Sequence, residues 1–80
     1  MKVMSKKTRR SSEEVLQRAK DFFNDNLGLK LSDESSNCCV EFKSNLGFVT
    51  VTTTDDNRER EVTVSTREYE AQIQEFLKRV

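Results

Sequence analysis

The sequence contains no histidine, no proline and no tryptophan, and it has only two glycines among its 80 residues. Histidine is the commonest general base, the usual partner of a nucleophilic serine or cysteine, and the commonest metal ligand. The two glycines stand apart, so the chain also lacks a glycine-rich loop that could hold a phosphate group. We therefore predict that the protein is not an enzyme and has no catalytic residues, no metal site and no cofactor.

The only two cysteines, Cys38 and Cys39, are neighbours in the chain. A bridge between adjacent residues departs from ordinary disulfide geometry, so we expect two reduced thiols, which are typical of cytoplasmic proteins. No apolar run approaches the ~20 residues of a membrane span, and no apolar segment typical of a signal peptide follows the basic start. We predict a cytoplasmic protein that does not contact a membrane.

Charge is distributed unevenly, although the formal net charge is zero. Residues 1–10 contain no acid, whereas the remaining seventy residues carry nine basic and fourteen acidic side chains, a net charge of −5. Residues 1–10 show no helix or strand periodicity, and their few apolar side chains cannot offset the entropy of ordering them. We predict a flexible basic arm over residues 1–10 and a single domain over residues 11–80. The cations of this arm are Lys2, Lys6, Lys7, Arg9 and Arg10.

Residues 47–54 are rich in β-branched side chains and contain no charge, which predicts a strand. Apolar and polar residues alternate over residues 38–43 and 61–65, so each of these segments is predicted to be a strand with one buried face. The polar connections at residues 44–47 and 55–57 are short enough for hairpin turns. Together these segments predict a three-stranded antiparallel meander with residues 47–54 in the middle.

Two amphipathic helices are predicted to flank the meander. Ser11 and Glu14 have the spacing of a capping box, as do Ser65 and Glu68, with Thr66 as an alternative cap for the second helix. The apolar stripe of the first helix consists of Val15, Leu16, Ala19, Phe22, Phe23 and Leu27. The stripe of the second helix consists of Tyr69, Ile73, Phe76, Leu77 and Val80.

The segment between the first helix and the meander is less regular. Leucines alternate over residues 27–31, which predicts either a short edge strand or an extended segment that covers the core. Residues 32–37 contain two acids and no apolar side chain, so we predict a polar loop there.

These elements predict an α+β fold in the order α-β-β-β-α, with both helices packed on one face of the sheet. The residues expected to be mutually packed and nearly inaccessible are Phe22, Val40, Val51, Val64, Ile73 and Phe76. The element order is similar to that of double-stranded-RNA-binding domains, which place lysines at the start of their last helix. Here Arg67 is followed by Glu68 and Glu70, so the charge required by that family is absent.

The face of the sheet opposite the helices is the candidate site for contact with another protein. Its predicted members are Cys39, Glu41, Lys43, Phe48, Thr50, Thr52 and Thr63. Phe48 is the main reason for this assignment, because it is predicted to lie among threonines outside the core. We predict a non-enzymatic binding or assembly module that contacts another protein through this face or through an edge strand. Because charged side chains line the edge strands, we expect a monomer or a weak homodimer.

A nucleic-acid accessory domain is the alternative function. In this interpretation the five cations of the basic arm contact phosphate groups and tether the domain to nucleic acid. No aromatic residue lies among those cations, and the rest of the chain is acidic.

Overall fold

The protein is described from a computed structural model, which describes residues 1–35, 38–56 and 59–80, without the side chains of Ser35 and Asp56. The described residues form five strands and three helical segments. In chain order these elements are β1 (Lys2–Thr8), α1 (Ser12–Ala19), the π-helix η1 (Lys20–Asn26), β2 (Lys30–Ser35), β3 (Cys39–Lys43), β4 (Phe48–Asp56), β5 (Glu59–Arg67) and α2 (Glu70–Lys78).

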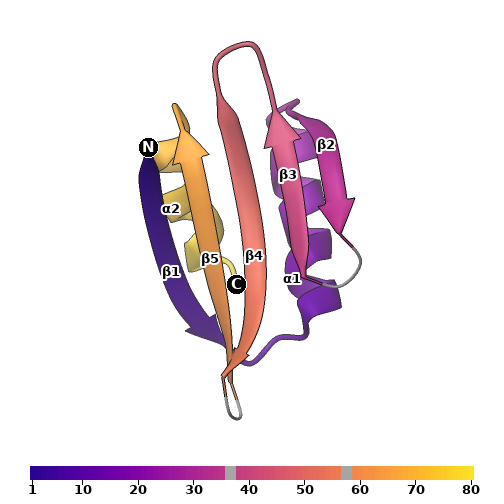
Figure 1. Cartoon of the computed structure of the whole chain (residues 1–80), viewed down its shortest axis with the longest axis vertical. Helices are drawn as coiled ribbons and strands as arrows, with labels where there is room; N and C mark the ends of the chain where they lie inside the picture. Colours follow the sequence, from indigo (N-terminus) through magenta and orange to yellow (C-terminus); the bar gives the residue numbers. More distant parts are fainter. Residues whose placement is uncertain (36–37, 57–58) are drawn as a thin grey trace.

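The strands form one antiparallel sheet in the order β1-β5-β4-β3-β2 (Figure 1). Strand β4 is the middle strand, as predicted from the strand candidates on each side of it. The expected α+β class is confirmed, but the meander of β3, β4 and β5 is extended by one strand at each side. The prediction of three strands was therefore wrong.

Strand β1 corrects the prediction of a flexible basic arm. Its backbone pairs with β5 over the whole length of β1, from Lys2 opposite Thr66 to Thr8 opposite Arg60. The Lys6 ammonium group also donates a hydrogen bond of 2.8 Å to the carbonyl oxygen of Leu77, in the last turn of α2. Backbone pairing does not depend on side-chain polarity, so a chain with few apolar residues can still be ordered by the unpaired edge of β5.

Strand β2 corrects the prediction of a polar loop over residues 32–37, because residues 32–35 pair with β3. A bulge at Ser32 shifts the register between Leu31 and Asp33. Residues 36 and 37 of that predicted loop, and Asn57 of the predicted second turn, lie outside the described residues.

The predicted cap of α1 is confirmed, because the Ser11 side chain accepts a hydrogen bond from the Glu14 amide. The next helical segment, η1, has the wider turns of a π-helix, which shift the phase of the apolar stripe. Phe23 is therefore fully buried, whereas Phe22 is half-buried and Leu27 is exposed. The prediction that Phe22 is inaccessible was wrong for this reason.

Helix α2 starts later than its predicted capping box. Ser65 and Thr66 belong to β5, which continues to Arg67, and the helix begins at Glu70 without a side-chain cap. Between the two elements Glu68 has a φ of 83°, a left-handed conformation that turns the chain from the sheet into the helix.

The core lies between the sheet and the helices. The other five residues predicted for it are buried, namely Val40, Val51, Val64, Ile73 and Phe76. The Phe23 ring lies 5.2 Å from the ring of Phe76 and 5.5 Å from the ring of Phe42 between centroids, so η1, α2 and β3 meet there. No helix among the described residues is long and apolar enough to cross a lipid bilayer.

A disulfide joins Cys38 to Cys39, which corrects the prediction of two reduced thiols. In a continuous strand the two side chains would point to opposite faces. Strand β3 begins only at Cys39, and Cys38 lies in the preceding turn. The Cys38 side chain therefore does not have to point to the face opposite that of Cys39. The bridge closes only the small ring between two neighbouring residues, and therefore it does not join two separate elements.

Candidate functional site: the open face of the sheet

The sheet has one covered and one uncovered face, because α1, η1 and α2 all lie on the same side of it (Figure 1). We call the uncovered side the open face. It consists of the strand residues that alternate with the core residues. Its described members are Val3, Ser5 and Lys7 in β1, Lys30 and Asp33 in β2, Cys39, Glu41 and Lys43 in β3, Phe48, Thr50, Thr52 and Thr54 in β4, and Glu59, Glu61, Thr63, Ser65 and Arg67 in β5.

Hydroxyl groups occupy the centre of the open face. Thr52 lies opposite Thr63 across β4 and β5, and Thr50 lies opposite Ser65 in the same strand pair. Ser5 of β1 extends the first of these rows, because it lies opposite Thr63. Each hydroxyl can donate and accept a hydrogen bond, so this centre can match either kind of group on a partner.

The Glu41 side chain is held by several contacts on the open face. Its carboxylate accepts hydrogen bonds from the hydroxyls of Ser32 at 3.0 Å and Thr50 at 3.4 Å. The Lys43 ammonium group lies 3.6 Å from the same carboxylate, although the Lys43 side chain remains 63% exposed. This network fixes the position of one negative charge beside the threonines.

Phe48 lies on the open face, as the sequence predicts, and not beneath a helix. It is half-buried, whereas the next residue, Val49, points to the other side and is fully buried in the core. Phe48 lies opposite Lys43 of β3 on one side and opposite Arg67 of β5 on the other. Gly47 allows this close approach of β4 and β5, because a Cβ atom there would overlap the carbonyl oxygen of Arg67.

All seven residues predicted for protein contact are on the open face. The structure thus brings together Cys39, Glu41, Lys43, Phe48, Thr50, Thr52 and Thr63. Cys39 contributes a disulfide sulfur to this surface and not a thiol, because it is bridged to Cys38.

The cations predicted to form a nucleic-acid-binding arm are not brought together. In β1, Lys6 lies on the helix side and binds Leu77, whereas Lys7 lies on the open face. Arg10 follows the strand and forms an ion pair of 3.2 Å with Glu14 of α1. Lys2 and Arg9 are exposed near opposite ends of the strand. The five cations therefore do not form one continuous basic surface.

Lys30 and Arg67 also lie on the open face, although they are not among its predicted members. The alternation from Val64 through Thr66 places Arg67 outside, provided that β5 continues beyond Ser65. Likewise, Leu29 is buried, so the next residue, Lys30, points away from the core if a strand begins there. The alternation that places these two residues outside the core is present in the sequence, but it applies to each residue only if the strand extends that far.

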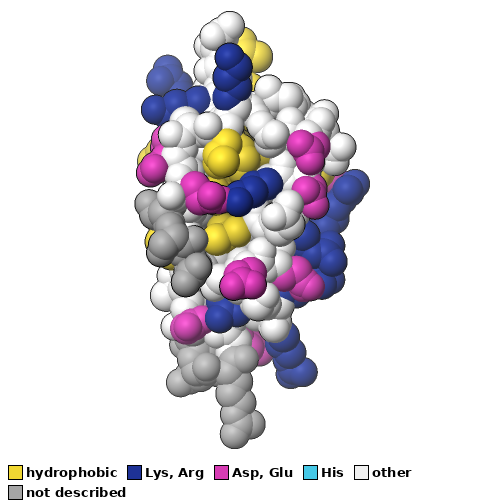
Figure 2. All heavy atoms as spheres, turned by 90° about the vertical axis from the view of Figure 1, so that its right-hand side faces the viewer, with side chains coloured by type: hydrophobic (Ala, Val, Ile, Leu, Met, Phe, Trp, Pro, Cys, Tyr) yellow, Lys and Arg dark blue, Asp and Glu magenta, His cyan; other side chains and the backbone are white. Residues whose placement is uncertain are grey.

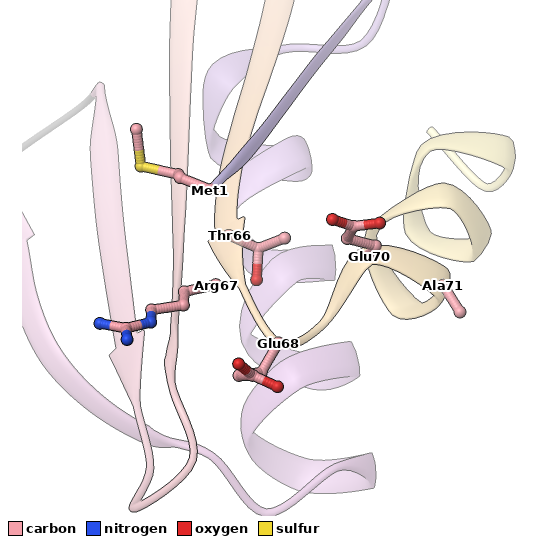
Figure 3. Close-up of a pocket in the computed structure, with 6 residues that line it drawn as sticks. All are labelled: Met1, Thr66, Arg67, Glu68, Glu70 and Ala71. Carbon is pink, nitrogen blue, oxygen red and sulfur yellow. The ribbon is translucent and has the colours of Figure 1, made fainter.

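One hollow near the start of α2 is formed mainly by polar and charged residues. It has a volume of about 420 Å³ and is lined by Met1, Thr66, Arg67, Glu68, Glu70 and Ala71 (Figure 3). Figure 3 shows the side chain of Arg67 extending away from Glu68 and Glu70 and toward β4. Within the described residues, no group of three or more acidic or cysteine side chains is placed to hold a metal ion.

Comparison with known proteins found no family model that matches this chain and no curated protein that matches it in sequence. The function is therefore inferred from the residues and their arrangement alone.

Proposed function

We propose that this protein is a small non-enzymatic binding module and that the open face contacts its protein partner. The observation that supports this most directly is the one-sided packing of the helices, which leaves one face of the sheet uncovered. That face is about 19 Å wide, given a spacing of about 4.8 Å between strands. The face combines hydroxyl groups at its centre with the ring of Phe48 at one end, a composition suited to a moderately polar protein contact.

The edges of the sheet are less suited to this role. Charged side chains occupy both edge strands, such as Lys2 and Lys7 in β1 and Asp33 and Glu34 in β2. Figure 2 shows the side of the molecule at which β2 lies, where small hydrophobic areas are bordered by acidic and basic side chains. Charges on an edge strand oppose the addition of another strand. We therefore assign the contact to the open face and not to an edge.

A non-enzymatic role rests on the lack of histidine in the sequence. A cytoplasmic location also remains a prediction, and the disulfide removes the reduced thiols on which it partly rested.

A second copy of the chain is the protein partner that can be tested directly. Two-dimensional amide NMR spectra of the labelled protein should be recorded at low concentration and at about 1 mM. The higher concentration is near the Kd of a weak contact with a binding free energy of about 4 kcal/mol. Amide shifts at Thr50, Thr52 and Thr63 should change with concentration, and those of α1 should not. Changes confined to the helices, or no changes, would contradict the proposal.

A matched pair of variants locates the contact. Thr52→Arg places a charge at the centre of the open face and should abolish the concentration dependence. Gln17→Arg places the same charge on an exposed position of α1 and should leave it unchanged. An equal effect of the two variants would point to charge alone and would count against the open face.

A further inference from the structure

One end of the open face carries a row of cations with an aromatic ring among them. Lys30 lies opposite Lys43, Lys43 lies opposite Phe48, and Phe48 lies opposite Arg67. We call these four residues, which come from β2, β3, β4 and β5, the basic row. We propose that the basic row binds a single-stranded nucleic acid, with a base stacked on Phe48 and phosphate groups at the cations. This goes beyond the protein contact proposed above, because it assigns a ligand of another class to one end of the open face, where Lys43 and Phe48 are shared with that contact and Lys30 and Arg67 are added to it.

The cations of the row have charge available for a ligand. Within residues 1–35, 38–56 and 59–80, neither Lys30 nor Arg67 forms an ion pair, and both side chains are exposed. Lys43 has only the 3.6 Å contact with Glu41, and its side chain is 63% exposed. Such exposed pairs are weak, so Lys43 can also turn toward a phosphate.

The position of Phe48 suits stacking of a base. Adjacent strands lie about 4.8 Å apart, so the backbones of Lys43 and Arg67 flank Phe48 at about that distance on each side. An aromatic side chain between two cations can stack a base while the flanking charges hold the phosphates before and after it. This is the interleaving of aromatic and basic residues that the N-terminal cations lack.

A hollow beside the row offers room for a phosphate group. It has a volume of about 240 Å³ and is lined by Gly28, Lys30, Lys43, Ser44 and Asn45. Two ammonium groups can neutralise an anion there, and the side-chain amide of Asn45 can donate a hydrogen bond, whereas the Ser44 hydroxyl is already bonded to Tyr69. At the other end of the row Arg67 extends toward β4 (Figure 3), so its guanidinium points over the sheet and not into the acidic side chains of Glu68 and Glu70.

Negative charges limit where the strand can lie. Asp33 and Glu41 lie opposite each other on the open face, near Lys30 and Lys43 in the same two strands. They repel a polyanion from the rest of the face and favour a path along the basic row. A duplex would not suit this site, because its bases are already stacked and paired. An acidic peptide would use the cations but not the ring of Phe48.

The test measures fluorescence anisotropy of a labelled oligothymidine of about ten nucleotides, within the range of one small binding site. Binding should weaken with salt, and log Kobs against log[salt] should have a slope of about −2 for three phosphate contacts on a single strand. A duplex of the same length should bind at least about fivefold more weakly, since it offers no base for stacking. Equal binding of single strand and duplex would overturn the proposal, and so would equal competition by polyglutamate.

Two sets of variants separate the basic row from the N-terminal cations. Lys30→Gln with Arg67→Gln should reduce the slope to about −0.7, because one phosphate contact remains. Lys2→Gln with Arg9→Gln removes the same charge from exposed positions outside the row and should leave the slope unchanged. The reverse result would assign binding to the N-terminal cations and overturn the proposal.

Phe48 variants test stacking separately from charge. Phe48→Leu keeps an apolar side chain but should weaken binding by about fivefold or more, the range for loss of one stacked base. Phe48→Tyr keeps the ring and should bind like the parent. If both variants lose binding while their melting temperatures are unchanged, a base does not stack on Phe48. The same conclusion follows if neither variant loses binding. None of these variants alters Thr52, so the Thr52→Arg test of protein contact is carried out on a chain with an intact basic row.

Discussion

At the residue scale, Phe76 joins α2 to the aromatic side chains of η1 in the core. It is 1% exposed, and its ring lies 5.2 Å from Phe23 and 6.0 Å from Phe22 between centroids. Phe76→Ala should lower the free energy of unfolding by about 3–5 kcal/mol, the range for a buried aromatic side chain. Urea denaturation followed by circular dichroism measures this change.

Phe22→Ala is the matched control for Phe76→Ala. Phe22 is half-buried, and its exposed side lies under the Arg79 guanidinium, 5.3 Å from the ring centroid. Its truncation should cost less than that of Phe76, because less apolar surface returns to water. A Phe76→Ala variant with the parent's urea midpoint would show that α2 does not stabilise the core.

Glu68 carries the only positive φ of a non-glycine residue among the described residues, at 83°. This conformation costs about 1–2 kcal/mol for an L-residue and little for glycine, which in turn loses more entropy on folding. Glu68→Gly should therefore raise the free energy of unfolding by about 1 kcal/mol or less, measured by urea denaturation.

Gln74→Gly is the comparison for Glu68→Gly. Gln74 is exposed in the middle of α2, where glycine should lower the free energy of unfolding by about 1 kcal/mol. If both substitutions destabilise the protein equally, then the turn at Glu68 is not strained.

At the element scale, β1 is the segment whose role differs most from its sequence-based prediction. Thr8 is buried, Met4 packs against the core, and Lys6 holds the carbonyl of Leu77. Deletion of residues 1–8 would expose the edge of β5 and the end of α2. The free energy of unfolding should fall by about 2 kcal/mol or more, comparable with the loss of one buried apolar side chain and a hydrogen bond.

Thermal unfolding of the parent and of the truncated protein measures this effect, with Lys2→Ala as a control that keeps the backbone of β1. If deletion leaves the melting temperature unchanged, β1 does not contribute to stability and behaves as the flexible arm that the sequence predicts.

The starts of the two helices differ in how well the sequence predicts them. The cap of α1 is local and was predicted, but the start of α2 depends on how far β5 pairs with its neighbours.

At the scale of the whole molecule, the Cα radius of gyration is 11.4 Å, close to the value of about 11.6 Å expected for a compact chain of this length. Charged edges and the absence of a broad apolar patch in the proposed contact favour a monomer at low concentration. Sedimentation velocity should show a monomer at about 10 µM and the onset of weak dimerisation near 1 mM.

A dimer that persists at about 10 µM would contradict the expected weakness of the contact through the open face. Thr52→Arg should remove the dimer seen at high concentration, whereas Gln17→Arg should keep it. This control separates specific contact from simple crowding of a chain with zero formal net charge.

The sequence by itself determined the parts of this protein that depend on local patterns. Alternation in β3, β4 and β5 identified which side chains face the core, and hence all seven predicted members of the open face. The capping residues determined the start of α1, because that hydrogen bond spans only three positions. The α+β class and the central position of β4 follow from the same patterns.

The tertiary structure decided the features that need partners distant in sequence. Strand β1 forms because β5 offers unpaired backbone groups, which no local pattern records. Pairing with β3 extends β2 to Ser35, beyond the alternating leucines that indicated an edge strand over residues 27–31. The basic row needs three strand registers at once, because it joins Lys30, Lys43 and Arg67 around the ring of Phe48. A shift of a single residue in any strand would send its side chain to the other face, so only the paired sheet could bring these residues together.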